Sequence, residues 1–254
     1  CLQEYAVIGD AEARLLTSPE APIVLVRARD DVRRVAPSVA PGMRHFGVML
    51  PDTPLHVLLM RDLRRPVVAT SGNLAEEPMC TDEREVVRVL GGIADVFLVH
   101  DRPIVRAVDD SVVRVVAGRE LVLRRARGSA PLPVPLPREA PPLVAVGGHL
   151  KNTVSVTAGA GIVVSQHIGD LDSAATGEAF HATLASLEHL YRVHPGAAVV
   201  DLHPDYQSTA YGRTMGLPVT AVQHHYAHLA ACMVDNDLRG PVVGAVWDGT
   251  GYGT

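Results

Sequence analysis

Residues 217–236 read LPVTAVQHHYAHLAACMVDN, a short β-type run followed directly by a helical run that contains three histidines. The helical run, from position 224 to 236, is rich in Ala and contains neither Gly nor Pro. His224 and His228 are four residues apart, so a helix places both imidazoles on one face, as a shared metal ion requires. A helix that opens just past a strand end is where α/β proteins place ligands. The stretch therefore predicts an α/β unit with a metal site at this strand end.

A second string, DGTGYG at residues 248–253, follows the apolar run VVGAVW at 242–247, which predicts a strand. A strand that ends in Asp-Gly-x-Gly offers a carboxylate for a cation and glycine amides for phosphate oxygens. Taken alone, Asp-Gly is also a turn dipeptide, and a histidine pair also occurs as packing or surface residues. Together the strings predict a metal-binding pair, His224 and His228, beside a phosphate loop.

Lysine occurs once among the 23 basic residues, at Lys151 in the glycine turn GGHLKN of residues 147–152. A lone lysine in such an arginine-biased chain indicates a role for a compact point charge, such as a contact to phosphate. For Lys151 alone, chance retention on a surface loop is an equally good interpretation.

Composition indicates a folded globular protein, since 47% of the 254 residues are hydrophobic and 20% are charged. The formal net charge is −5 without a long Lys/Arg run, which argues against nucleic-acid binding. Three distant cysteines without a CxxC pattern suit a reducing cytoplasm, and no apolar run reaches membrane length. The chain opens at Cys1 without Met and stops in a glycine loop, so we expect a fragment.

Residues 130–142, APLPVPLPREAPP, form the clearest boundary. So many prolines exclude helix and central strand, and they predict an extended, stiff spacer. The spacer divides the chain into a unit at 1–129 and a unit at 143–254.

The second unit shows the order βββαβαβα, followed by the strand that leads into Asp248. The expected strands are 143–146, 153–157, 162–167, 197–202 and 217–222, and the expected helices are 173–193, 205–215 and 224–236. This order is that of one half of an actin-like (ASKHA, ribonuclease H-like) α/β ATP-binding domain. In that fold glycine hairpins grip the nucleotide phosphates, and Lys151 and Asp248 lie in or beside such loops.

The first unit contains β-type runs at 22–27, 47–50, 66–69 and 109–116. The third run leads into TSGN at 70–73, which clusters hydroxyl and amide groups. The unit ends in LRRARG at 123–128, and arginines near Ser, Thr and Asn suit binding of a nucleotide or another anion. A solvated basic edge strand is the alternative.

Eight motifs in order resemble the HypF family of hydrogenase maturation carbamoyltransferases. They are TSGNLAEEPM (70–79), HDRPIVRAVDDSVVRVV (100–116), LRRARGSAP (123–131), GGHLKNT (147–153), SQHIGDL (165–171), DLHPDYQST (201–209), QHHYAHLAAC (223–232) and DGTGYG (248–253). The resemblance runs through essentially the whole chain. It implies the latter part of a YrdC-like domain, a linker, and the first half of a TsaD-like ASKHA domain.

The resemblance implies a sequence of reactions. Carbamoyl phosphate yields carbamate in an N-terminal acylphosphatase domain, and the YrdC-like domain activates carbamate with ATP as carbamoyl-adenylate. The TsaD-like domain then transfers the carbamoyl group to the C-terminal cysteine of a partner, HypE, on the way to a cyanide ligand of the nickel-iron hydrogenase. This chemistry needs phosphate clamping and electrophile activation more than a strong protein nucleophile.

The same resemblance assigns site residues. The metal ligands are His224, His228 and Asp248, with iron or zinc as candidates, because two imidazoles and a carboxylate suit both. The nucleotide site of the ASKHA half comprises Lys151, Asn152, Gly249, Thr250 and Gly251. The residues for ATP with Mg²⁺, or for the adenylate, in the YrdC-like unit are Thr70, Ser71, Asn73, Ser111, Arg125 and Arg127. Asp201 and His203 are candidates for a catalytic carbamoyl pocket, with a structural cap as the alternative.

Two positions depart from the family pattern: Asp52, where an aromatic or amide residue is expected, and Tyr226, where a third consecutive histidine is expected. The acylphosphatase domain, the zinc fingers and the second ASKHA half are absent, so we expect the fragment to be inactive alone. Two other functions stay open, an O-carbamoyltransferase of antibiotic biosynthesis and a non-catalytic nucleotide-binding scaffold.

Overall fold

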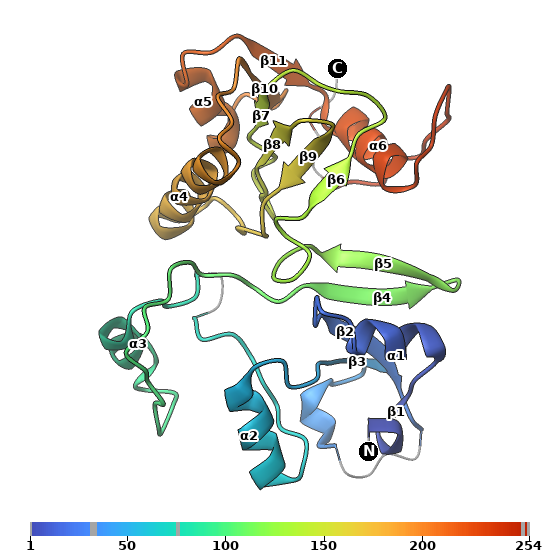
Figure 1. The fold of residues 1–254 in the computed structure, drawn as a ribbon, viewed down its shortest axis with the longest axis vertical. Helices are drawn as coiled ribbons and strands as arrows, with labels where there is room; N and C mark the ends of the chain where they lie inside the picture. Colours follow the sequence, from blue (N-terminus) through green and yellow to red (C-terminus); the bar gives the residue numbers. More distant parts are fainter. Residues whose placement is uncertain (1, 31–34, 75–76, 250–251, 253–254) are drawn as a thin grey trace.

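The computed structural model describes residues 2–30, 35–74, 77–249 and 252, and it has two β-sheets with helices packed around them. Figure 1 shows the second sheet and its helices above the β4–β5 hairpin of the first unit. The α/β class predicted from the sequence is confirmed.

The first sheet has five strands, in the order β1-β2-β4-β5 with β3 also paired to β2. Its strands are β1 (Ala6–Val7), β2 (Ile23–Ala28), β3 (His45–Val48), β4 (Val112–Val116) and β5 (Arg119–Arg124). Helix α1 (Asp10–Leu16) packs on it, and the short 3₁₀ turns η1 (Leu2–Glu4) and η2 (Pro37–Val39) flank it. Alternate residues of β2, Val24 and Val26, are fully buried with Val113, as period-2 alternation in a half-buried strand requires.

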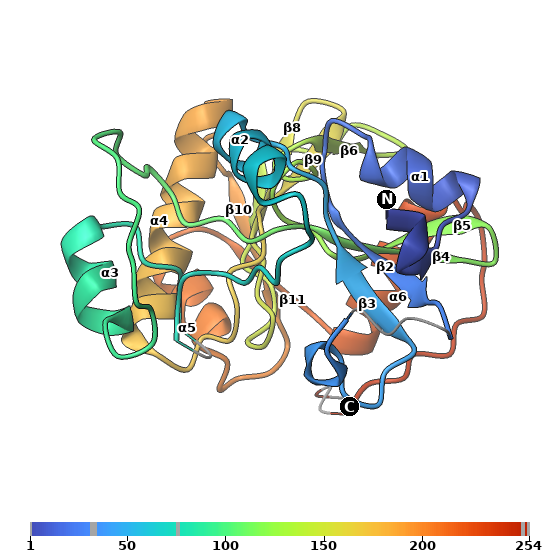
Figure 2. The same cartoon turned by 90° about the horizontal axis from the view of Figure 1, so that it is seen from below.

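The described part of residues 54–107, which omits 75 and 76, contributes no buried residue to either core. Helices α2 (Pro54–Leu63) and α3 (Glu83–Leu90) form from local signals, since Thr53 caps α2 and Asp82 caps α3. Figures 1 and 2 both place α3 away from the first sheet. The strand predicted at 66–69 is wrong, because the structure has no strand there and Val67 and Val68 are exposed. A β-type run becomes a strand only where a neighbour pairs with its backbone, and none is found in the described ranges.

The second sheet has the order β11-β10-β7-β8-β9-β6. Its strands are β6 (Pro133–Pro135), β7 (Leu143–Ala145), β8 (Ser155–Ala158), β9 (Gly161–Val164), β10 (Ala197–Asp201) and β11 (Val219–Val222). Strand β10 pairs in parallel with β7 and β11, whereas β7-β8, β8-β9 and β9-β6 are antiparallel. Within the proline-rich segment 130–142, β6 pairs with β9 at the sheet edge, a position that proline tolerates, so this part of the segment is extended but belongs to the second sheet.

Three helices complete the second unit: α4 (Ala174–Tyr191), α5 (Gln207–Thr214) and α6 (His224–Asp235). Helix α4 begins with a capping box between Ser173 and Thr176 and buries Phe180, Leu184 and Leu187 against the sheet. These helices match the predicted ones within a few residues. The strand predicted at 242–247 is wrong, because this segment runs without a paired neighbour in the described chain and Val243 and Trp247 are exposed.

Polar contacts join the second unit to the first unit and to the connecting segment 130–142. The amide of His167 donates to Arg125 O at 3.0 Å, and the His167 ring lies 3.3 Å from the Asp109 carboxylate. Arg106 donates to Ser186 Oγ at 3.0 Å, and Tyr191 donates its hydroxyl to Pro131 O at 2.7 Å. Within the described residues, no helix combines the length and the apolar character that crossing a membrane requires.

Candidate functional site

The candidate site lies where two parallel strands, β10 and β11, end side by side. Asp201, the last residue of β10, pairs with Val222, the last residue of β11, and the amide of Leu202 donates to Val222 O at 2.9 Å. Gln223 then caps α6, since its Oε1 accepts from Tyr226 N at 2.7 Å. Helix α6 therefore starts two residues beyond the last residue of β11, and its first residue, His224, faces the end of β10.

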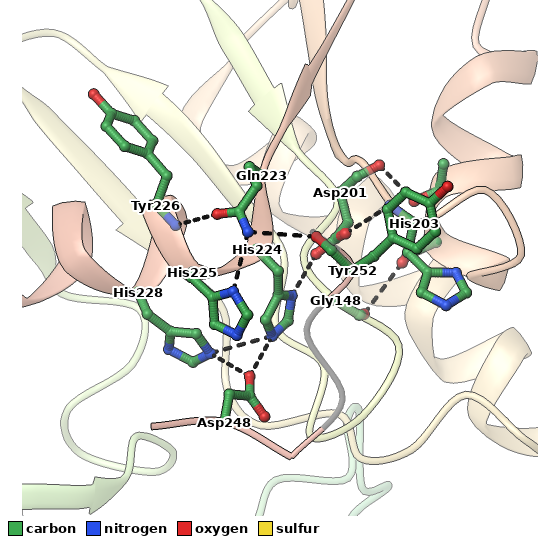
Figure 3. A network of polar contacts seen from close by, with 12 residues as sticks. Gly148, Asp201, His203, Gln223, His224, His225, Tyr226, His228, Asp248 and Tyr252 are labelled. Carbon is green, nitrogen blue, oxygen red and sulfur yellow. Dashed lines mark hydrogen bonds and ion pairs between the residues drawn. The ribbon is translucent and has the colours of Figure 1, made fainter. Parts of the chain in front are cut away.

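Three side chains converge at the start of α6, as Figure 3 shows. His224 Nε2 lies 2.8 Å and His228 Nε2 3.1 Å from Asp248 Oδ2, and the two Nε2 atoms are 3.2 Å apart. The predicted spacing is thus realised, with both rings on one face of α6 and Asp248 approaching from a segment twenty residues later. The structure brings the three predicted metal ligands together.

The donor set suits a transition metal. Two nitrogen ligands at 2.0–2.1 Å from one ion lie about 3 Å apart, close to the separation of the two Nε2 atoms. Asp201 Oδ2 lies 2.6 Å from His224 Nδ1, and because a carboxylate only accepts hydrogen bonds, this contact favours the tautomer with its hydrogen on Nδ1 and its lone pair on Nε2. That lone pair faces a carboxylate oxygen of Asp248, an arrangement that a cation between them stabilises. Imidazole and carboxylate ligands do not distinguish iron from zinc.

An aromatic stack borders the triad. The ring of His203 lies parallel to Tyr206 at a centroid distance of 4.1 Å, and His149 stacks on Tyr206 at 5.5 Å. Tyr206 also lies edge-on to His224 at 6.4 Å. His203, predicted for a carbamoyl pocket, thus contacts the triad through Tyr206, which also links it to the glycine turn that contains His149.

The glycine turn at residues 147–152 is held by Asn152. Gly147 has φ +70°, and a Cβ there would meet Thr153 O at 2.1 Å, so only glycine fits. Asn152 is 1% exposed, and its Nδ2 donates to Val146 O at 2.9 Å and to Gly148 O at 2.6 Å. The buried Asn152 amide thus holds the turn through its nitrogen, while its Oδ1 has no hydrogen-bond partner among the described residues, so a contact of Asn152 with nucleotide stays a prediction. Lys151 is exposed, with its backbone amide donating to Asp170 Oδ1 at 2.6 Å.

A cavity of about 650 Å³ lies between the two units. It brings together predicted residues from both, since Ser71, Asn73 and Arg125 line it with Lys151. Arg125 Nε and Asn73 Oδ1 are buried without a hydrogen-bond partner, so both have unused polar capacity. Burial lowers the pKa of Arg125, an effect that the charge of Asp235 partly offsets. Thr70 is exposed and is not among the lining residues.

Arg127 and Ser111 are engaged within the first unit instead. Arg127 donates to Asp52 Oδ2 at 2.6 Å and to Asp110 Oδ1 at 2.8 Å, so two carboxylates neutralise its guanidinium. Burial raises the pKa of Asp52, but the hydrogen bond from His56 and the charge of Arg127 outweigh it and lower the pKa overall. Ser111 is fully buried, donates to Arg127 O and accepts from Ala126 N. Ser111 therefore holds the backbone on either side of Arg127's amide, and its contact with a nucleotide stays a prediction.

The DGTG loop is described only in part. Gly249 is exposed, with nothing near its missing Cβ, whereas the predicted residues Thr250 and Gly251 lie outside the described residues. The Gln223 amide nitrogen donates to Tyr252 O at 3.4 Å, which ties the loop to the start of α6. Sequence reasoning did not identify Gln223 or Tyr206. The Gln immediately before the helix was a capping signal for Gln223, and the aromatic in DLHPDY was the signal for Tyr206.

Comparisons with known proteins match both units. The family model for the HypF Kae1-like domain matches residues 138–235, and the model described as telomere recombination (Sua5, YciO and YrdC) matches residues 2–126. The chain is 52% identical over 98% of its length to carbamoyltransferase HypF of Synechocystis, and 43% identical over 99% to that of Rhizobium leguminosarum. It spans 33% and 34% of these relatives, about a third of their length.

Two solved structures resemble the whole chain. One is full-length HypF in a phosphate- and nucleotide-bound form, at TM-score 0.94 and 42% identity, and it covers 100% of this chain and 40% of that one. The other is HypF of T. kodakarensis, at TM-score 0.93 and 35% identity, covering 100% of this chain and 34% of that one. The fold similarity therefore includes both sheets and their relative placement.

Proposed function

The chain belongs to the HypF carbamoyltransferase family, and from this premise we propose that it is part of an ATP-dependent carbamoyltransferase of [NiFe]-hydrogenase maturation. The observation that carries the proposal is the convergence of His224, His228 and Asp248 at the carboxyl end of β10 and β11. Residues 1–129 belong to the YrdC-like domain and 143–254 to the TsaD-like ASKHA domain in this proposal. Strand β6 of the intervening 130–142 segment is part of the second sheet. The site of action is the cytoplasm.

The proposed reaction has two group transfers. Carbamate, obtained from carbamoyl phosphate, attacks the α-phosphorus of ATP with Mg²⁺, which forms carbamoyl-adenylate and releases pyrophosphate. The thiolate of the C-terminal cysteine of HypE then attacks the carbamoyl carbon, and AMP leaves with the electron pair of the broken C–O bond. Both steps build up negative charge on phosphate oxygens, so positioned cations and amides matter most.

The residues divide into two groups in this proposal. Thr70, Ser71, Asn73, Arg125 and Arg127 bind ATP or the adenylate in the first unit. Lys151 and the DGTG glycines bind nucleotide phosphate in the second, while Asn152 shapes the turn that presents Lys151. The cavity between the units supports this division, because lining residues of both groups face one space. Arg127 must exchange at least one carboxylate for phosphate when it binds nucleotide.

His224, His228 and Asp248 would hold the iron or zinc ion, which when bound supplies a Lewis acid for a phosphate or carbonyl oxygen. The protein's own contribution is to orient the three ligands and the aromatic stack beside them. The His203–Tyr206 stack gives the site one flat apolar wall, which suits a planar carbamoyl group. We assign His203 to this wall.

The experiment is carbamoyl-phosphate-dependent exchange of pyrophosphate into ATP, together with carbamoyl transfer to HypE, in the full-length protein. We compare wild type with His224→Ala and with His189→Ala, a matched control because His189 is exposed at the end of α4. Retained exchange with lost transfer in His224→Ala, and wild-type behaviour in His189→Ala, support adenylation in the first unit and transfer in the second. Absence of exchange in the wild type would refute the proposal and favour a nucleotide-binding scaffold.

Transfer to HypE also separates this function from carbamoylation of a small-molecule hydroxyl. Exchange without transfer to the HypE cysteine in the wild type would favour an O-carbamoyltransferase. The family membership supports the protein thiol as acceptor.

A further inference from the structure

Asp201 lies directly behind the first histidine of the triad. Its Oδ2 accepts from His224 Nδ1 at 2.6 Å, and its Oδ1 accepts from the backbone amide of His203 at 2.8 Å. The Asp201 side chain is 7% exposed. Both carboxylate oxygens thus have polar partners inside the protein: Oδ1 contacts the turn after β10, and Oδ2 contacts the imidazole (Figure 3).

The backbone fixes Asp201 more firmly than a surface carboxylate. It is the last residue of β10, in register with Val222 of β11, and its carbonyl accepts from Thr209 Oγ1 at 3.1 Å. His224 is held equally firmly, since it opens α6 two residues beyond Val222. The distance between this carboxylate and this ring is therefore set by the pairing of two adjacent parallel strands.

The contact selects one tautomer of His224. A carboxylate only accepts hydrogen bonds, so when the Asp248 carboxylate binds a cation and not a ring N–H, the neutral ring carries its hydrogen on Nδ1, toward Asp201, and leaves its lone pair on Nε2. Nε2 is the atom that lies 2.8 Å from Asp248 Oδ2 and 3.2 Å from His228 Nε2. With the opposite tautomer, the lone pair would face the buried carboxylate and the triad would lose one ligand atom.

Asp201 itself is placed to act through His224 and not on a ligand. It contacts the Nδ1 edge of the ring, while the triad gathers at the Nε2 edge, so the imidazole stands between the carboxylate and the point where the three ligand atoms meet. Its low exposure also keeps it from a substrate in the open site. This placement differs from a carbamoyl pocket, for which Asp201 was a candidate.

We propose that Asp201 is a positioning residue that orients His224 and fixes its tautomer, so that Nε2 is available as a metal ligand. The proposal rests on the metal site of the proposed function. A carboxylate of this kind fixes the tautomer and the ring orientation of a ligand histidine, and its removal typically weakens metal binding about 10–100-fold.

The test uses the full-length protein, freed of metal, in four forms: wild type, Asp201→Ala, Asp201→Asn and Asp205→Asn. Asn keeps an acceptor oxygen but removes the charge, and Asp205 is an exposed aspartate on the same loop that serves as the matched control. Two quantities are measured, the affinity for Zn²⁺ by titration and the tautomer of His224 by ¹⁵N-histidine NMR. The His224 resonances are assigned by their loss in His224→Gln, and melting temperatures verify folding.

We expect Asp201→Ala to lose about 10–100-fold in Zn²⁺ affinity and to shift His224 away from the Nδ1–H tautomer. Asp201→Asn should fall between Ala and wild type, and Asp205→Asn should match wild type. If Asp201→Ala does not fold, the comparison of Asp201→Asn with Asp205→Asn decides whether Asp201 positions His224. Folded Asp201 variants with wild-type affinity and an unchanged His224 spectrum would overturn the proposal.

The two readouts separate this proposal from the metal site itself. A wild type that binds no Zn²⁺ and no Fe²⁺ contradicts the metal site, while the tautomer of His224 in the metal-free protein still tests the role of Asp201. A metal-binding wild type whose Asp201 variants are unaffected contradicts only the positioning role.

Discussion

The carboxylate of Asp109 lies 3.3 Å from Nδ1 of His167, although one residue belongs to the first unit and the other to the second. Arg124 approaches the same carboxylate at 3.9 Å. The hydrogen bond from His167 lowers the pKa of Asp109, burial opposes the shift, and the charge of Arg124 adds to the lowering. Asp109, His167 and Arg124 therefore form an ionic contact between the first and the second unit.

The contact between Asp109 and His167 predicts that the protein loses stability at low pH. A carboxyl group whose pKa is lower in the folded than in the unfolded state stabilises the fold above its unfolded pKa, and this stabilisation disappears as the pH falls through the folded pKa. Asp109→Asn should therefore lower the free energy of unfolding by about 1 kcal/mol at pH 7. The difference from wild type should shrink as the pH falls from about 4 through the lowered pKa of Asp109. Thermal melts across this pH range measure the difference in stability between Asp109→Asn and wild type. Asp95→Asn, at an exposed aspartate, is the control. An equal difference at all pH values would contradict the assignment.

Removal of a proposed metal ligand should weaken metal binding more than removal of the carboxylate that orients such a ligand. His228→Ala deletes an Nε2 atom 3.2 Å from that of His224, so its loss of Zn²⁺ affinity should be larger than the roughly 10–100-fold expected for Asp201→Ala. Metal content after dialysis and the affinity in titration measure this, with His189→Ala unchanged. Equal affinities of His228→Ala and wild type would remove His228 from the site.

Gly147→Ala should destabilise the glycine turn strongly. A Cβ at this position would meet Thr153 O at 2.1 Å, and the backbone has φ +70°. Gly159→Ala is the matched control, because Gly159 has φ +62° but nothing within 4 Å of a Cβ. We expect the control to cost about 1 kcal/mol and Gly147→Ala clearly more, since conformational strain and a backbone collision add. Denaturant unfolding of both variants gives the comparison, and equal costs would show that the turn relaxes.

Asp52→Asn should strengthen nucleotide binding. Arg127 is bound to Asp52 at 2.6 Å and to Asp110 at 2.8 Å, and it must leave a carboxylate to reach phosphate. Loss of one carboxylate lowers that cost, so ATP affinity should rise severalfold, up to roughly tenfold for about 1.4 kcal/mol. Titration with ATP measures the change. Asp62→Asn, in an exposed pair with Arg61, should leave the affinity unchanged, and weaker binding of Asp52→Asn would contradict the assignment of Arg127.

The order of elements after residue 143 could be predicted because each carries a local signal. The spacing of Phe180, Leu184 and Leu187 indicates α4, and the Gly- and Pro-free run from His224 indicates α6. The runs at 66–69 and 242–247 have equally strong β patterns but no partner strand in the described chain. A strand is a property of a pair of segments, and one run of residues cannot specify it.

The side chains that converge at the site could be predicted only where they share one helix or follow an apolar, strand-like run of residues. His224 and His228 follow from helical spacing alone. The contact of Asp201 with His224 depends on the register of β10 and β11, which the sequence does not state. Likewise Asn152 and Ser111 are polar residues in loops, and only their burial shows that they hold backbone.

One of the two edge strands of the second sheet, β6, limits the pairing of that edge with other molecules. Strand β6 consists of Pro133, Val134 and Pro135, and prolines have no amide hydrogen to offer a further strand. Open sheet edges with free amides are templates for pairing with other chains. By ending on a strand of this composition, the sheet offers few donors for edge-to-edge growth, so the segment that joins the units also protects the protein against aggregation through that edge.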